Sequence, residues 1–135
     1  MALIVDTGPL VSLLDSTDPD HERCTELLQE TSERRLIPVL VLVEVEYLLR
    51  PWPQAFPALL AEFAAGGFEL IELPFPWLLR AGELLEQYRD LSLGLVDASV
   101  VASMEMLDEA RLATLDHRHF TAVRPAHVAS LTLLP

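Results

Sequence analysis

The chain has 135 residues, a formal net charge of −12 and 51% hydrophobic residues, and all nine of its basic residues are arginines. This length fits one folded domain, and the apolar content argues against disorder. Because lysine is absent, P-loop NTPases, haloacid-dehalogenase phosphatases and response-regulator receivers are excluded, since each class depends on a lysine. The acidic balance also argues against a protein that coats nucleic acid through basic stripes.

The N-terminal half is predicted to alternate short strands with helices. Ala2–Val5 is a continuous apolar run, typical of a buried strand. Residues 39–50 could form a strand because of their β-branched side chains, but their length, their Leu and Glu content and the following Pro51 favour a helix. The expected helices are residues 9–14, 19–31, 39–50 and 54–65, and a second strand is expected over residues 36–37.

The C-terminal half continues the same alternation. Strands are expected over residues 68–73, 111–115 and 130–134, and helices over residues 77–89 and 96–107. Strands separated by helices indicate a single α/β domain over residues 1–135, with a central parallel sheet flanked by helices on both faces.

The location of the protein is predicted from what its sequence lacks. No apolar run reaches the roughly 18–20 residues of a membrane helix. The first residues lack the basic region of a signal peptide, and the single Cys24 cannot form an internal disulfide. We therefore expect a cytoplasmic protein that does not associate with a membrane.

Four carboxylates stand where an apolar residue would be expected: Asp6, Glu44, Asp97 and Asp116. A buried ionised carboxylate needs a cation or a hydrogen-bonding partner. Asp6 and Asp116 each end an apolar strand, and α/β sheets bind their ligands at the carboxyl ends of strands. Thr7 and Thr114 could contribute hydroxyl groups to the same edge. This pattern predicts a shared site for divalent metal ions.

Three of these acids also have a purely structural interpretation. Asp6 and Asp97 could each cap the helix that follows it. An Asp in the loop after a strand, such as Asp116, is common in any protein. Apolar residues three, four and seven positions after Asp97 nevertheless predict that this side chain lies on the buried face of its helix.

Glu44 is preferred over Glu46 as the acid of the third helix. The neighbours of Glu44 at helical spacing are Leu40, Val41, Tyr47 and Leu48, which predicts that Glu44 lies within the apolar stripe. Glu46 instead precedes Arg50 by four residues, which is the favourable order for a surface ion pair.

Carboxylate oxygens suit Mg²⁺ or Mn²⁺, and one or two such ions serve phosphodiester hydrolysis. The histidines show neither zinc-site spacing nor a pairing with Cys24, and His117 and His119 are interpreted as parts of a polar loop after a strand. The sequence contains no G-x-S-x-G motif and no Gly-rich phosphate loop. Metal-dependent phosphoryl chemistry is the predicted class of reaction.

The order of these segments resembles the PIN-domain family, and in particular the VapC-type toxin ribonucleases of toxin–antitoxin systems. The resemblance is carried by Asp6-Thr7 after the first strand, Glu44 within an apolar helix, and the segments LGLVDASVVA and RLATLDHRHF, and it spans essentially the whole chain. It implies that Asp6, Glu44, Asp97 and Asp116 bind Mg²⁺ or Mn²⁺ and that metal-activated water cleaves RNA. The chain departs from the family pattern at Gly8-Pro9, where a Ser–apolar pair is more usual, and at His117, where some members carry another acid.

The same resemblance implies an antitoxin partner and a homodimer. An acidic toxin suits a basic inhibitor, because complementary fields speed association. Arg34, Arg35 and Arg118 are the candidates for contacts with RNA or antitoxin. Two alternatives remain open: a PIN-like binding or scaffold module with weak or lost catalysis that acts through a protein partner, and a metal-dependent phosphatase or DNase.

Overall fold

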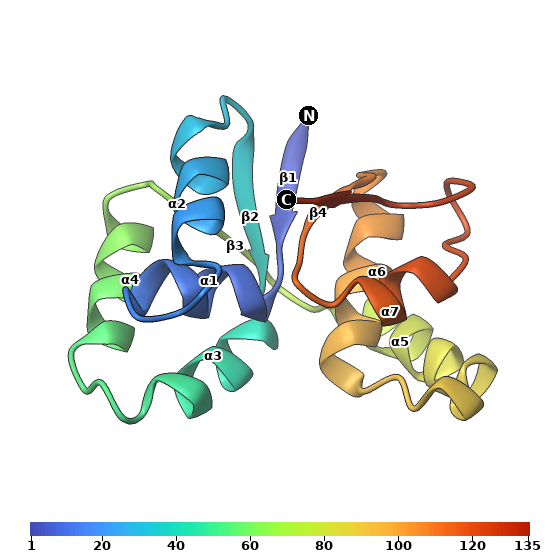
Figure 1. Cartoon of the computed structure of the whole chain (residues 1–135). Coiled ribbons are helices and arrows are strands. Elements are labelled where there is room, and N and C mark those ends of the chain that lie inside the picture. Colours follow the sequence, from blue (N-terminus) through green and yellow to red (C-terminus); the bar gives the residue numbers. More distant parts are fainter.

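The computed structural model describes residues 1–135 as one parallel five-stranded sheet with helices on both sides, which confirms the predicted fold class (Figure 1). The strands are β1 (Ala2–Val5), β2 (Arg34–Pro38), β3 (Glu69–Ile71), β4 (Arg111–Ala113) and β5 (Thr132–Leu134). The helices are α1 (Thr7–Leu14), α2 (His21–Glu30), α3 (Val41–Leu49), α4 (Ala55–Ala64), α5 (Phe75–Gln87), the 3₁₀-helix η1 (Arg89–Leu91), α6 (Leu95–Leu107) and α7 (His117–Ala122). None of the helices combines the length and the apolar composition that crossing a membrane requires.

The strand order β3-β2-β1-β4-β5 places the first strand in the middle of the sheet. From β1 the chain moves outward through β2 to β3, and it then crosses back to add β4 on the other side of β1. All of these pairings are parallel. Sheets of this kind open a crevice at the carboxyl ends of the two strands between which the order reverses. In this protein those strands are β1 and β4.

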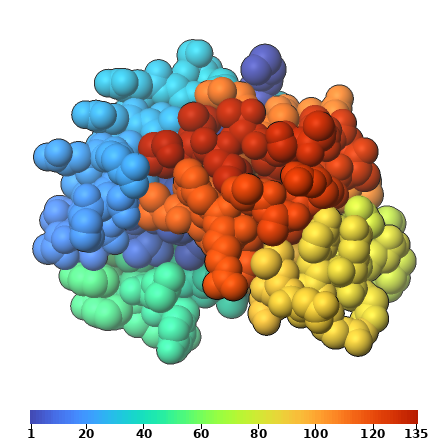
Figure 2. Space-filling model, turned by 45° about the vertical axis from the view of Figure 1, so that its right-hand side comes forward, coloured from blue at the N-terminus to red at the C-terminus, as the bar shows by residue number.

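The core explains why β1 and α6 are so apolar. All four residues of β1 are buried, as expected for a central parallel strand that is covered on both faces. Residues 98–104 of α6 are buried without interruption, because this helix lies between the sheet and α5. Figure 1 shows α1 to α4 on one side of the strands and α5 and α6 on the other, while Figure 2 shows the segment after β4, in orange and red, between these two groups.

The boundaries differ from the predicted ones by a few residues at helix starts and at strand ends. Helix α1 begins at Thr7, so Pro9 occupies its third position rather than its first. The N–H groups of the first helical turn have no acceptor within the helix, and a proline is therefore tolerated there. For the same reason α5 begins at Phe75 and accommodates Pro76. Helix α7 was not predicted at all, and this correction bears on the functional site.

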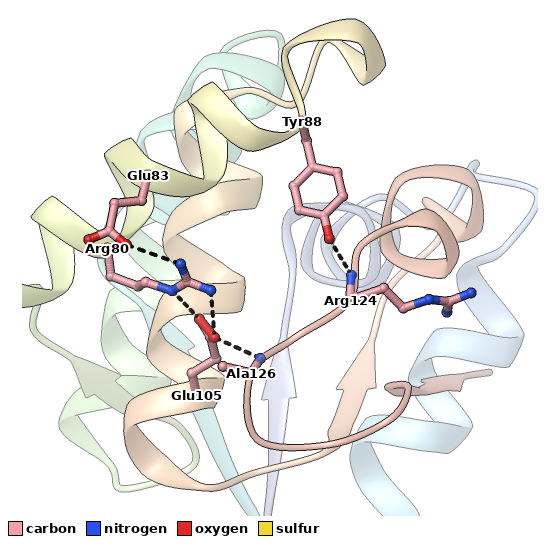
Figure 3. Close-up of polar contacts among 6 residues, drawn as sticks. All are labelled: Arg80, Glu83, Tyr88, Glu105, Arg124 and Ala126. Carbon is pink, nitrogen blue, oxygen red and sulfur yellow. Dashed lines mark hydrogen bonds and ion pairs between the residues drawn. The ribbon is translucent and has the colours of Figure 1, made fainter.

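A largely buried carboxylate on α6 joins this helix to α5 and to the segment that follows α7 (Figure 3). The Glu105 side chain is 5% exposed, and its two oxygens accept hydrogen bonds from Arg80 Nε and Nη2 at 2.8 and 3.1 Å. The backbone N–H of Ala126 donates a third bond at 2.9 Å, and nearby the Tyr88 hydroxyl accepts from the N–H of Arg124 at 2.7 Å. Burial alone would raise the pKa of Glu105, but Arg80 and Ala126 hold it below its usual range.

Replacing Glu105 with Ala is expected to lower the free energy of unfolding by about 3 kcal/mol, because the substitution leaves the Arg80 guanidinium without its buried partner. Glu83→Ala is the matched control, since Glu83 pairs with the same arginine through a side chain that is 66% exposed. That exposed pair is worth less than about 1 kcal/mol. Urea denaturation of both variants measures the difference, and equal losses would contradict a structural role for the buried pair.

Candidate metal centre

The four acids singled out in the sequence lie around one open depression at the carboxyl ends of β1 and β4. Asp6, Glu44, Asp97 and Asp116 all line it, together with Thr7, Gly8, Leu48 and Leu115. The acids come from four separate places in the chain: the junction of β1 and α1, helix α3, the first turn of α6, and the junction of β4 and α7. The fold thus brings together side chains that lie far apart in the sequence, at the edge of the sheet where ligands are expected.

Asp6 is buried, and one of its oxygens has no partner within the protein. The residue is 5% exposed, and its Oδ2 accepts a hydrogen bond from Thr114 Oγ1 at 2.9 Å. Its Oδ1 is buried without any hydrogen bond. Asp6 stands at the N-cap position of α1, but its side chain does not cap the helix, so the capping interpretation is wrong. A buried acceptor without a donor is rare, and a bound cation would satisfy it.

The proximity of the acids is reflected in their proton affinities. The pKa of Asp6 is raised from 3.8 to about 7, mainly by burial and also by the charges of Asp97 and Glu44, while hydrogen bonds from the Thr7 backbone and Thr114 oppose the shift. The pKa of Asp97 is raised to about 6, mainly by burial and also by the charges of Asp116 and Glu44, while His119 opposes the shift. Without a cation these carboxyl groups therefore resist ionisation, and a divalent ion would remove that penalty.

Glu44 reaches the depression, but the prediction that it lies within the buried apolar stripe of the helix was wrong. It is exposed rather than buried, because Val41, Val45 and Leu49 form the face of α3 that packs on the core. Thr7 Oγ1 donates a hydrogen bond to Glu44 Oε1 at 2.7 Å, which holds this carboxylate at the site. The rejected Glu46 accepts from Arg50, as its spacing predicted.

Asp97 is the third residue of α6, where Gly94 rather than Asp97 occupies the N-cap position. The capping interpretation is therefore wrong for this acid too, and the predicted burial is partial, with 19% of the side chain exposed. The N-terminus of a helix carries a partial positive charge, which favours a carboxylate in the first turn. This field helps Asp97 to remain ionised despite its neighbours.

His119, on helix α7 next to the predicted Asp116, is the part of the site that the sequence did not predict. Residues 117–122 form α7 rather than a polar loop, and Asp116 caps this helix by accepting from the backbone N–H of His119 at 3.1 Å. The first turn of α7 places the His119 imidazole next to the acids. Its Nδ1 lies 2.8 Å from Asp116 Oδ2 and 3.3 Å from Asp97 Oδ2. An Asp three residues before a His was the signal available in the sequence.

Two small features hold the β1 and β4 ends together. The Thr114 hydroxyl donates to Asp6 and accepts from the N–H of Asp116 at 3.0 Å, so it orients both acids. A Cβ atom on Gly8 would lie 3.1 Å from the Cβ of Leu115. The glycine therefore permits the close approach of α1 to the loop that carries Asp116.

The three arginines proposed to contact RNA or a partner lie in different environments. Arg34 and Arg35 begin β2, at the opposite edge of the sheet from the acids. The Arg34 guanidinium is held by Glu69, and Arg35 donates to the carbonyl of Leu28. Neither residue therefore lies at the acidic centre, so neither can steer RNA toward the centre as the sequence had suggested. Arg118 is exposed on α7, beside the centre.

The fold and this acidic centre define an α/β protein with a site suited to divalent metal ions. The family model of the PIN domain matches residues 3–124, and the chain belongs to this family. The chain is also 30% identical over 135 residues to Ribonuclease VapC26 of Mycobacterium tuberculosis, and the match covers 98% of this chain and 100% of the relative. These findings confirm the resemblance seen in the sequence.

Solved structures share the fold at lower identity. The toxin VapC20 of Mycobacterium tuberculosis, which cleaves the Sarcin-Ricin loop, superposes with a TM-score of 0.83 at 21% identity, over 95% of this chain and 99% of that one. VapBC2 from Rickettsia felis, bound to a DNA fragment from their promoter, has a TM-score of 0.70 at 18% identity, over 98% and 97% of the two chains. A toxin–antitoxin complex from Klebsiella pneumoniae has a TM-score of 0.67 at 20% identity, over 95% and 100%.

Proposed function

We propose that this protein is a Mg²⁺- or Mn²⁺-dependent endoribonuclease and the toxin of a type II toxin–antitoxin pair. It would hydrolyse phosphodiester bonds of single-stranded or structured RNA in the cytoplasm. The observation that carries the proposal is the convergence of four acids on the switch point of a PIN-family sheet, with one buried oxygen of Asp6 unpartnered. The relation to a ribonuclease over the whole chain supports RNA as the substrate.

The residues present fit one or two divalent ions. Asp6, Glu44, Asp97 and Asp116 offer oxygen donors of the kind that Mg²⁺ and Mn²⁺ prefer, and their mutual repulsion favours a cation among them. When bound, such ions lower the pKa of water and stabilise charge on phosphate oxygens.

The other residues of the centre have supporting roles. Thr114 fixes the carboxylate of Asp6, and Thr7 fixes that of Glu44, so these acids keep their orientation when a substrate approaches. Arg118, which is exposed on α7, would contact a backbone phosphate of the bound RNA. Asp6 lies deepest and Glu44 is exposed, so the RNA backbone would meet the centre from the side of α3.

The partners follow from charge and from the relatives. A net charge of −12 opposes the approach of RNA but favours a basic inhibitor segment, as expected for an antitoxin. The similarity in fold to toxin–antitoxin complexes agrees with such a partner. We further propose that the toxin is a homodimer. The alternative, a PIN-like scaffold without catalysis, gives no reason to retain a buried carboxylate whose oxygen is unpartnered.

The purified protein is expected to cleave RNA in the presence of Mn²⁺ and to lose all cleavage in EDTA, because the acids alone cannot stabilise negative charge on a phosphate. A panel of structured and single-stranded RNAs is incubated with the protein, once with Mn²⁺ and once with EDTA. The fragments are then resolved by electrophoresis. Cleavage that persists in EDTA would contradict the proposal.

Two further substrates separate the alternatives. Single-stranded DNA and a small phosphomonoester, offered under the same conditions, are expected to remain intact. Preferential turnover of either would indicate a DNase or a phosphatase instead. Tight binding of a protein partner without cleavage of any RNA would favour the scaffold.

A further inference from the structure

The imidazole of His119 bridges two acids that belong to different elements. The backbone N–H of His119 donates to Asp116 Oδ1, and this hydrogen bond caps α7. The cap does not explain the position of the imidazole ring. Its Nδ1 lies 2.8 Å from Asp116 Oδ2 and 3.3 Å from Asp97 Oδ2 on α6. His117, two residues earlier on the same helix, is exposed. The position of the His119 ring therefore follows from the acidic centre and not from helix formation alone.

The spacing of these atoms matches that of ligands on one ion. An octahedral ion with bonds of about 2.0–2.2 Å holds neighbouring ligand atoms about 3.0 Å apart. The two N···O separations at His119 lie on either side of that value. One ligand atom from each of Asp97, Asp116 and His119 also lies within 4.8 Å of the others. The three side chains are therefore close enough to one another to share one ion.

An independent observation points to a cation at this place. Asp6 lines the same depression as Asp97 and Asp116, and its buried Oδ1 has no donor within the chain. A cation bound in this depression would satisfy that oxygen. No hydrogen bond within the protein explains why Asp6 Oδ1 is buried.

We propose that His119 is a metal ligand through Nδ1 and that it makes the centre selective for first-row transition ions over Mg²⁺. This inference rests on the proposed metal centre and specifies the ion that the centre prefers. Imidazole nitrogen is a common ligand of first-row transition ions, whereas Mg²⁺ is best served by oxygen donors alone. Ligation requires the neutral ring with its proton on Nε2, which leaves Nδ1 free to donate its lone pair.

Pulsed electron paramagnetic resonance of Mn²⁺ bound to the tag-free protein tests the ligand directly, because a coordinated imidazole gives a nitrogen coupling. The coupling is expected in the wild type and in the control His117→Ala, and it should vanish in His119→Ala and His119→Gln. The Gln variant keeps a hydrogen-bond donor near both acids, so it separates ligation from simple positioning. A loss of coupling from His117→Ala would overturn the assignment.

Metal titrations give a second readout that does not depend on catalysis. Loss of even an outer partner of a ligand lowers metal affinity about 10–100-fold. We therefore expect both His119 variants to bind Mn²⁺ and Co²⁺ at least about tenfold more weakly, with Mg²⁺ affinity changed less than about threefold. Equal losses for all three ions would overturn the selectivity.

Two outcomes distinguish this inference from the function on which it rests. Tight Mn²⁺ binding to the wild type without nitrogen coupling would overturn the role of His119 and leave the acidic centre intact. An absence of any Mn²⁺ binding would overturn both.

Discussion

Replacing Asp6 with Asn is expected to slow metal-dependent RNA cleavage by at least about a hundredfold and, at the same time, to stabilise the metal-free protein. Metal ions contribute several kcal/mol to reactions of this kind, and about 1.4 kcal/mol corresponds to tenfold in rate. Asn keeps the shape and the acceptor for Thr114, so the variant removes the charge but not the packing. The rate constant of RNA cleavage at saturating Mn²⁺ measures the loss.

The stabilising effect should depend on pH in a defined window. The Asp6 pKa is about 7 in the folded protein and 3.8 ordinarily, so the unfolded chain releases this proton first as the pH rises. Stability in EDTA therefore falls from about pH 4 to about pH 7 and then levels off, by up to about 4 kcal/mol for this group. Asp97, with a pKa of about 6, adds to the fall between about pH 4 and about pH 6.

Chemical denaturation in EDTA at about pH 4.5 and about pH 7.5 measures this slope for the wild type, for Asp6→Asn and for Asp90→Asn. Asp90 is exposed in η1 and serves as the control for loss of one negative charge. Asp6→Asn should be the less pH-dependent variant and the more stable one at the higher pH. If Asp6→Asn were destabilised and kept the slope of the wild type, the buried oxygen would have another partner.

Replacing Glu44 with Gln is expected to lower Mn²⁺ affinity and the cleavage rate at limiting Mn²⁺ by about 10–100-fold. Gln still accepts the Thr7 hydrogen bond, so α3 and α1 should keep their arrangement. The adjacent acid offers a matched control, because Glu46→Gln removes only a surface pair with Arg50. That variant should cleave within about twofold of the wild type.

Initial rates over a range of Mn²⁺ concentrations separate the two variants, and circular dichroism verifies that both are folded. The Glu44→Gln defect should shrink as Mn²⁺ is raised, because the loss lies in metal binding. Indistinguishable behaviour of the two variants would remove Glu44 from the centre.

The positions of the acids at strand ends could be predicted, because they follow from short-range patterns. An apolar strand that ends in an Asp can be recognised from the local sequence alone. Parallel strands then bring their carboxyl ends to the same edge of the sheet. Asp6 and Asp116 are therefore found where the sequence placed them. The crossover from β3 to β4, which makes β1 and β4 neighbours, is a property of the whole fold and was not predicted.

Helix α3 shows why the burial of Glu44 could not be predicted. This helix is apolar on two sides: Val41, Val45 and Leu49 pack on the core, whereas Val43 and Tyr47 are 65% and 64% exposed. Spacing alone cannot tell which of two apolar faces meets the sheet. Glu44 lines the depression and Glu46 pairs with Arg50, as the ion-pair spacing of Glu46 indicated, whereas the predicted place of Glu44 in the buried stripe was wrong.

His119 was missed because α7 is short and mostly polar. Its six residues bury only Phe120, so no helical period is visible. The helix exists because Asp116 caps it and because the chain beyond it is tied to α5 and α6 by Tyr88 and Glu105. Those contacts are long-range, and single-sequence patterns carry no information about them.

The central position of β1 has a consequence for when the protein can act. The hydrogen bond from Thr114 to Asp6 joins residues 108 positions apart, and one edge of β1 remains open until β4 has been made. A chain still on the ribosome that ends before Arg111 carries Asp6, Glu44 and Asp97 but lacks Thr114, Asp116 and His119. The acidic centre can therefore form only after β4 and α7 have been made, so a partly synthesised chain has no assembled metal site.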